Sequence, residues 1–131
     1  MVPEKSNIVP SEFIIVGGTG NLSKSKILPA LFWRFLDNQI DAQSNIILCD
    51  KYIKSKKDFF LELQSNCNEA IKSEDNNLEN WNNFIKIIKL VELDVVSGNG
   101  HLDLVKIIKE KFDENRPIIF YLAIASSLFG N

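Results

Sequence analysis

The sequence predicts an α/β fold, a doubly wound parallel sheet within one domain. Four short apolar segments alternate with amphipathic helical segments along the 131 residues, and this alternation favours a parallel sheet with helices on both faces. Crossovers between parallel strands are right-handed in nearly all proteins, which makes the predicted unit doubly wound. The first apolar segment runs directly into a glycine turn, Gly17-Gly18-Thr19-Gly20, that opens a helix. Nucleotide-binding turns occupy this place in such folds.

The N-terminal part contains the first strand and the first helix. Residues 1–11 hold two prolines and scattered charges and are expected to form a flexible lead-in, so the domain is expected to span residues 12–131. Residues 12–17, EFIIVG, predict a buried strand that ends at glycine. Residues 22–39 predict a helix that Pro29 kinks or restarts in a new turn. The apolar face of this helix contains Leu22, Ile27, Leu31 and Phe35.

The middle of the chain predicts a second strand and a second helix. Residues 44–50, SNIILCD, form a short apolar run typical of a buried strand. Residues 55–72 have the spacing of an amphipathic helix, and Ser55 and Asp58 match a cap pair at its start. The polar, asparagine-rich residues 73–83 suit a loop or a short helix. The apolar stripe of the predicted helix consists of Phe60, Leu63, Cys67 and Ile71.

The last third of the chain repeats the alternation. Residues 87–95, IIKLVELDV, predict a third strand, which the SGNG turn at 97–100 closes. Residues 101–112 predict a helix, and residues 116–124, RPIIFYLAI, predict a fourth buried strand. The complete pattern is that of a Rossmann-like coenzyme-binding domain.

The composition restricts the classes of binding partner and the cellular compartment that we expect. The net charge of −2 leaves no basic excess that could follow a nucleic acid backbone. No apolar run approaches the roughly 20 residues that span a bilayer, and residues 1–12 lack the apolar core of a secretory signal. Cys49 and Cys67 lie far from any CxxC spacing and are expected to be buried thiols. We therefore expect no nucleic acid, membrane or metal partner and a reducing, cytoplasmic location.

The chemistry of the glycine turn suits a phosphate. Without side chains the backbone can approach a pyrophosphate closely, and exposed N–H groups and the helix dipole meet its charge. The third glycine of the G-x-G-x-x-G fingerprint would be residue 23, which is a serine, so the fingerprint is incomplete. The alternative is a strand-to-helix connection that merely needs glycines. The polar and basic groups that could support a phosphate are Thr19, Asn21, Ser23, Lys24 and Lys26.

Two motifs carry a resemblance to a known family. GGTGNLSKSKILPALF, residues 17–32, resembles the signature of glucose-6-phosphate dehydrogenases, with Asn21 where the family has Asp and Ser23 where it has Ala. IIFYLAIASSLFG, residues 118–130, is similar to the family's F-Y-L-A motif and the aromatic position beyond it. The resemblance covers nearly all of this chain but only the N-terminal quarter or so of a family member. It implies a partial NADP-binding domain, with the family's C-terminal α+β domain absent from these residues.

The resemblance also implies site residues. The turn would hold the pyrophosphate of NADP, and Lys26 would lie near the sugar phosphate. Tyr52 stands where the family has the Arg that meets the 2′-phosphate, and Lys51 could supply the lost charge. Asp50 is an acid at the same strand end, which makes NAD possible, unless Asp50 is only a polar strand end. The implied coenzyme-binding residues are Gly17, Gly18, Thr19, Gly20, Asn21, Leu22, Ser23, Lys24, Lys51, Tyr52 and Phe129.

By this resemblance, the chain is the coenzyme-binding portion of an enzyme that oxidises glucose 6-phosphate to 6-phosphogluconolactone with NADP, in the pentose phosphate pathway. The family's sugar-phosphate motif and general-base histidine lie beyond these residues, and the one histidine, His101, is expected to be a surface or capping residue. Hydride transfer from a hydroxyl needs a base, so no catalytic residue is assigned and the chain alone is expected to be inactive. Sugar-phosphate binding and oligomer formation are expected only of the full-length enzyme. The alternative is a non-catalytic nucleotide-binding module or an inactive remnant.

Overall fold

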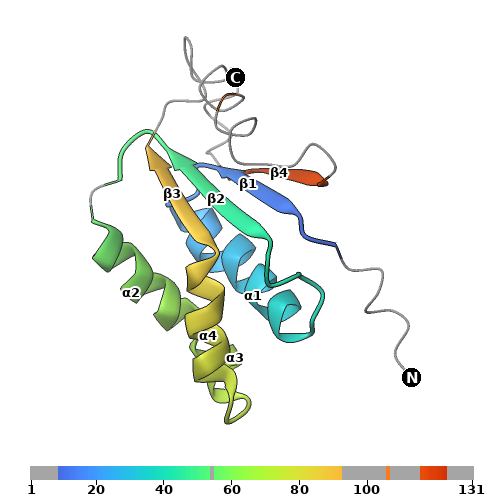
Figure 1. The fold of residues 1–131 in the computed structure, drawn as a ribbon. Helices are drawn as coiled ribbons and strands as arrows, with labels where there is room; N and C mark the ends of the chain where they lie inside the picture. Colours follow the sequence, from blue (N-terminus) through green and yellow to red (C-terminus); the bar gives the residue numbers. More distant parts are fainter. Residues whose placement is uncertain (1–8, 54, 93–105, 107–115, 124–131) are drawn as a thin grey trace.

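The computed structural model describes residues 9–53, 55–92, 106 and 116–123. Within them, one sheet contains four strands: β1 (Glu12–Val16), β2 (Asn45–Asp50), β3 (Ile88–Glu92) and β4 (Ile118–Leu122). Neighbouring strands run parallel, in the order β3-β2-β1-β4 (Figure 1). The α/β prediction and the four predicted strands are therefore confirmed, and the fold is Rossmann-like.

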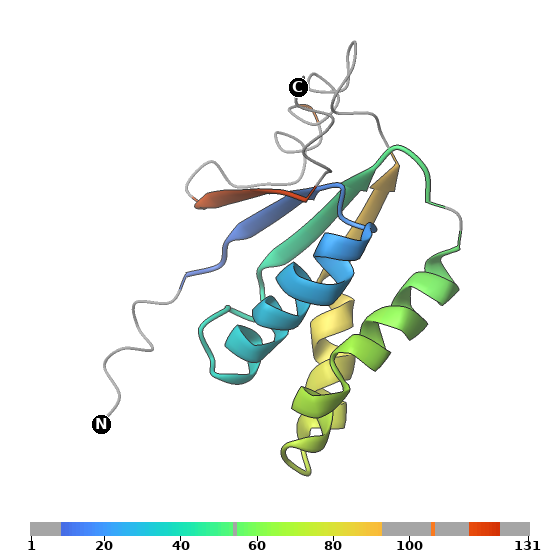
Figure 2. The ribbon, with the colours of Figure 1, turned by 180° about the vertical axis from the view of Figure 1, so that it is seen from behind.

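The helical segments of the described residues cover one face of this sheet (Figures 1 and 2). None of them is long and apolar enough to cross a membrane. The turn expected at 97–100 and the helix expected over 101–112 lie outside the described residues, apart from Lys106. Helices on both faces thus stay a prediction. In chain order the segments are a π-helical turn, η2 (Ser23–Ile27), and helices α1 (Leu28–Leu36), α2 (Lys56–Asn66), α3 (Asn68–Lys72) and α4 (Asn77–Lys86).

The first helix confirms the expected effect of Pro29. Because α1 begins at Leu28, Pro29 occupies its second position, directly after the π-helical turn. The missing N–H of proline costs little there, since the first N–H groups of a helix lack intrahelical acceptors. The wider π turn also changes the phase of the helix. Leu31 is buried and Phe35 packs against the core as predicted, whereas Leu22, predicted on the same face, is 46% exposed.

Helix α2 starts where its cap pair predicts. The side-chain oxygen of Ser55 accepts the backbone N–H of Asp58 at 3.2 Å. The single helix predicted over 55–72 is wrong, because the backbone of Cys67 (φ −99°, ψ 9°) ends α2 and begins α3. At both ends, the buried face of these helices differs from the predicted apolar stripe. The buried side chains of these two helices are Phe59, Leu63, Cys67 and Ala70, while Phe60 and Ile71 are only partly buried.

Aromatic side chains join α1 to α4. The polar residues 73–83, which suit either a loop or a helix, contribute most of their length to α4. On its buried side, Trp81 and Phe84 contact Phe32 of α1, with ring centroids 5.2 and 5.1 Å from the Phe32 centroid. The main hydrophobic core therefore lies between the sheet and these helices.

Strand β4 is not the buried strand that its composition predicts. Ile118, Phe120 and Leu122 are 41%, 55% and 60% exposed. The parallel register pairs Phe120 with Ile14 of β1, so these side chains lie on the sheet face away from α1, α2 and α4. Among the described strands β4 also pairs with β1 alone. A run of apolar residues indicates a strand, but it does not show that both of its faces are covered.

Both cysteines are buried, and we predict that they are unreactive in the folded chain. Burial, with a smaller effect of the adjacent Asp50 carboxylate, raises the pKa of Cys49 to about 11. Burial raises the pKa of Cys67 to about 12. At pH 8 the thiolate form that reacts with disulfide reagents is therefore about 100-fold rarer for Cys49 than in the unfolded chain, where the pKa is near 9.

The measurement is the rate of reaction with a chromogenic disulfide reagent at pH 8, in buffer and in 6 M urea (about the concentration that unfolds a small domain). We expect both thiols to react rapidly with the reagent in urea and slowly in buffer. Reaction in buffer at the rate of a free cysteine peptide would contradict the buried placement of both side chains.

Candidate coenzyme-binding site

The glycine turn follows the carboxyl end of β1 and packs against β2. Gly17 has φ 78°, a left-handed conformation that glycine adopts without strain. The N–H groups of Gly17 and Gly18 both donate to the carbonyl oxygen of Cys49, at 2.8 and 3.1 Å. A Cβ atom on Gly18 would lie 2.6 Å from the Cβ of Leu48 and 2.9 Å from the carbonyl oxygen of Ile15. The fold itself therefore requires both glycines.

Gly20 has no such internal requirement. Its φ is not in the left-handed region, and a Cβ atom there would have one neighbour, a carbonyl oxygen at 3.4 Å. The N–H of Lys24 donates to the carbonyl of Gly20 at 3.0 Å and begins the helical hydrogen bonds. The preceding N–H groups, those of residues 21–23, have no acceptor among the described residues. The fold does not require this glycine, and three backbone N–H groups without acceptors in the described part of the chain follow it. Phosphates bind at helix starts of this kind.

Asp50 faces the glycine turn from the end of β2. Its Oδ2 accepts the hydroxyl of Thr19 at 2.5 Å and the N–H of Thr19 at 3.1 Å. Its Oδ1 accepts the N–H of Lys51 at 2.9 Å. Asp50 is therefore more than a polar strand end, because its carboxylate fixes the turn against β2.

Lys24 is held by α2. Its ammonium forms an ion pair with Glu62, and its carbonyl accepts the side-chain N–H of Asn66 at 3.0 Å. The lysine charge beside the turn is thus partly neutralised. Sequence reasoning missed Glu62 and Asn66, which lie 38 and 42 residues along the chain from Lys24 and carry no local signal of this contact.

The remaining predicted residues of the helix start differ in exposure. Asn21, Leu22 and Lys26 are exposed, which leaves their side chains available to a ligand. Ser23 is buried, and its hydroxyl has no hydrogen-bond partner among the described residues. Alanine, the family's residue at this position, would remove that unpaired group. Roles for these side chains in coenzyme or sugar-phosphate binding stay predictions.

A cavity of about 310 Å³ lies beside the turn, between the end of β2 and α2. It brings together three of the predicted site residues: Thr19 from the glycine turn, Lys24 from η2, and Tyr52 after β2. Tyr52 is 71% exposed, with the ammonium of Lys51 6.0 Å from its ring centroid. Phe129 and His101 lie outside the described residues. The lining residues are Thr19, Lys24, Tyr52, Ile53, Ser55, Asp58, Phe59 and Glu62.

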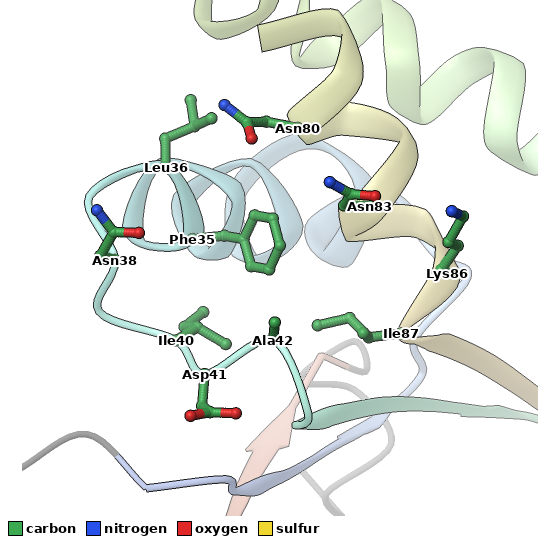
Figure 3. A pocket seen from close by; sticks show the side chains of 10 residues that line it. All are labelled: Phe35, Leu36, Asn38, Ile40, Asp41, Ala42, Asn80, Asn83, Lys86 and Ile87. Atoms are coloured by element: carbon green, nitrogen blue, oxygen red, sulfur yellow. The ribbon is translucent and has the colours of Figure 1, made fainter. Parts of the chain in front are cut away.

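A second cavity, of about 620 Å³, lies at the other end of the strands (Figure 3). The end of α1, the segment between α1 and β2 and the end of α4 form its walls, and Phe35 of α1 points toward Asn83 of α4. Although it is larger, it has no glycine turn and no open backbone donors of a helix start. Ligands of open α/β sheets bind at the carboxyl ends of the strands, so the smaller cavity is the better candidate. The described residues contain no group of three or more His, Cys, Asp or Glu that could hold a metal ion.

One known protein family matches most of this chain. The family model described as glucose-6-phosphate dehydrogenase, NAD binding domain, matches residues 14–131. The chain belongs to this family. The glucose-6-phosphate 1-dehydrogenase of Rhizobium meliloti is 29% identical over 124 residues, which cover 95% of this chain and 25% of that protein. The glucose-6-phosphate 1-dehydrogenase of Caenorhabditis elegans is 29% identical over 125 residues, 92% of this chain and 23% of that protein.

Solved structures of glucose-6-phosphate dehydrogenases have the same fold. A glucose-6-phosphate dehydrogenase in complex with its substrate glucose-6-phosphate superimposes with a TM-score of 0.75 at 26% identity, over 93% of this chain and 26% of that one. The enzyme from Mycobacterium avium superimposes with a TM-score of 0.67 at 17% identity, which supports the fold alone. The chain therefore spans about a quarter of the length of the glucose-6-phosphate dehydrogenases that it matches.

Proposed function

We propose that this chain is the coenzyme-binding portion of an oxidoreductase that oxidises glucose 6-phosphate to 6-phosphogluconolactone, with NADP or NAD as the hydride acceptor. Membership of the NAD-binding domain family supports the coenzyme class. The observation that carries the proposal is Gly20, where the fold leaves room for a side chain although the sequence has none. A pyrophosphate at that place would use the space and the open N–H groups of residues 21–23.

Each part of the site has a task in this function. The dinucleotide, when bound, accepts the hydride. The open N–H groups and the helix dipole hold its pyrophosphate, and Gly17 and Gly18 keep the turn close to β2 so that these groups face outward from the sheet end. Lys26, exposed on the first turns of the helix, is the residue we assign to the sugar phosphate. The two free, buried thiols suit a reducing cytoplasm.

The chain's own residues bind and orient the coenzyme, and we assign none of them to proton transfer. Removing a hydride from a sugar hydroxyl requires a base within hydrogen-bond reach of that hydroxyl. The one histidine of the sequence is His101, which sequence analysis assigns to a surface or a cap. We therefore assign the chemical step, the sugar-phosphate site and oligomer formation to the full-length enzyme.

Replacing Gly20 by valine is expected to abolish dinucleotide binding while the fold persists. The branched side chain would occupy the space through which the pyrophosphate approaches. Its first carbon meets a single carbonyl oxygen at 3.4 Å in the folded chain, so the stability cost should be small. Calorimetric titration with NAD and with NADP gives the affinities, and the thermal midpoint by circular dichroism reports the fold. Equal affinities for valine variant and wild type would contradict the proposal.

A further inference from the structure

We infer that the adenosine end of this site selects NAD over NADP, and that Asp50 is the residue that sets the choice. The inference rests on the proposed function, since it concerns which dinucleotide the same turn takes. It depends on three features of the described residues: the fixed carboxylate of Asp50, the charges around the neighbouring cavity, and the neutral ring of Tyr52.

The carboxylate of Asp50 is fixed where the adenine ribose binds in Rossmann folds. That ribose meets the end of the second strand, where an acid accepts its 2′-hydroxyl. Thr19 donates to Oδ2 from both its hydroxyl and its N–H, and Lys51 N–H donates to Oδ1. A carboxylate has about four lone-pair sites, so these three donors orient the group and leave it able to accept one more. A ribose hydroxyl can supply that donor, whereas a 2′-phosphate brings negative charge against negative charge.

The cavity beside Asp50 adds no compensating cation. Its lining contains the two carboxylates of Asp58 and Glu62 against the single ammonium of Lys24. That ammonium is already paired with Glu62. A 2′-phosphate carries close to two negative charges at neutral pH, and its binding sites usually provide a bidentate arginine. No arginine lines this cavity.

Tyr52 and the residues of the α2 start that line the cavity do not reverse this charge balance, since Lys56 and Lys57 are not among the lining residues. Tyr52 is a neutral, exposed ring at the cavity wall, which suits stacking on a base and offers no charge to a phosphate. The ammonium of Lys51 lies over that ring and Lys51 is not one of the lining residues. At the start of α2, the Ser55 hydroxyl accepts the Asp58 N–H, and the Asp58 carboxylate offsets the positive end of the helix dipole.

The experiment compares the two coenzymes on the wild-type chain and on Asp50→Asn by calorimetric titration at low salt. We expect NAD to bind at least about tenfold more tightly than NADP to the wild type, a difference of about 1.4 kcal/mol. Asparagine keeps the shape of the side chain and removes its charge. The ratio of the NAD affinity to the NADP affinity should therefore fall at least about fivefold, mainly through tighter NADP binding. Asp41→Asn is the matched control. Its carboxylate also accepts a backbone N–H, that of Gln43 at 2.7 Å, but it lines the cavity at the other end of the strands.

A pair of fragments tests the wild type without any variant. 5′-AMP and 2′,5′-ADP differ only in the 2′-phosphate, and we expect the monophosphate to bind more tightly. Equal or tighter binding of NADP and of 2′,5′-ADP would overturn the inference while leaving the proposed function intact. A preference for NAD that is the same in folded Asp50→Asn would overturn the role of Asp50. Absence of binding by both dinucleotides would overturn the proposed function together with the inference.

Discussion

Replacing Gly18 by alanine is expected to destabilise the folded chain by about 3 kcal/mol, the upper part of the range for overpacking a rigid site. The added carbon would lie 2.6 Å from the Cβ and 2.8 Å from the Cα of Leu48, and 2.9 Å from the carbonyl oxygen of Ile15. None of these atoms is the far end of a flexible side chain. Relief therefore requires the turn to separate from β2, which weakens the hydrogen bonds that Gly17 and Gly18 donate to Cys49.

The matched control is Gly20→Ala, the same change two residues further along the turn. A Cβ atom there has one neighbour at 3.4 Å, so its cost should stay within about 1 kcal/mol. Urea unfolding followed by circular dichroism gives both free energies of unfolding. Equal losses for the two variants would mean that the turn does not pack on β2 as described. The pair also separates the two uses of glycine, because Gly18 packs against β2, whereas we assign Gly20 to the proposed ligand.

Much of the fold could be predicted because its signals are local. Each strand is a short apolar run, the cap of α2 needs only Ser55 and Asp58, and Pro29 marks the start of α1 within its own turn. The incorrect predictions concern features that depend on the three-dimensional arrangement of the elements. The exposure of Phe120 follows from which face of β4 the helices cover, and the exposure of Leu22 follows from a π-helical turn that apolar spacing does not reveal.

The site divides in the same way. The glycine turn and the acid at the end of β2 are visible in the sequence because each stands at the carboxyl end of a predicted strand. The contact between Thr19 and Asp50 joins residues 31 positions apart, and the ion pair of Lys24 with Glu62 joins residues 38 apart. From the sequence, a role for Asp50 depends on whether its side chain faces the glycine turn, and the structure shows that it does. Nothing in the helical pattern of α2 indicates that Glu62 reaches the turn.

Replacing Arg116 by leucine is expected to cost about 3 kcal/mol of folding free energy. Its guanidinium donates to Oε1 of Glu12 at 2.7 Å and to the carbonyl of Gln43 at 3.1 Å. The Glu12 side chain is fully buried, and its other oxygen has no partner among the described residues. Without the arginine, a buried carboxylate remains without its cation, which typically costs about 3–5 kcal/mol. Arg116 is 27% exposed, so water can reach part of the gap, and the lower end of that range is expected.

The decisive comparison is between the two single variants and the double variant. Glu12→Leu removes the buried charge and lets the partly exposed guanidinium of Arg116 turn to water, so it should cost much less than Arg116→Leu. Glu12→Leu with Arg116→Leu should then recover at least half of the loss of Arg116→Leu alone, because an apolar pair replaces a buried ion pair with little penalty. Urea unfolding of the four chains gives the coupling energy directly. Additive losses would show that Arg116 stabilises the start of β4 through packing. They would also show that burial of the Glu12 carboxylate does not depend on the positive charge of Arg116.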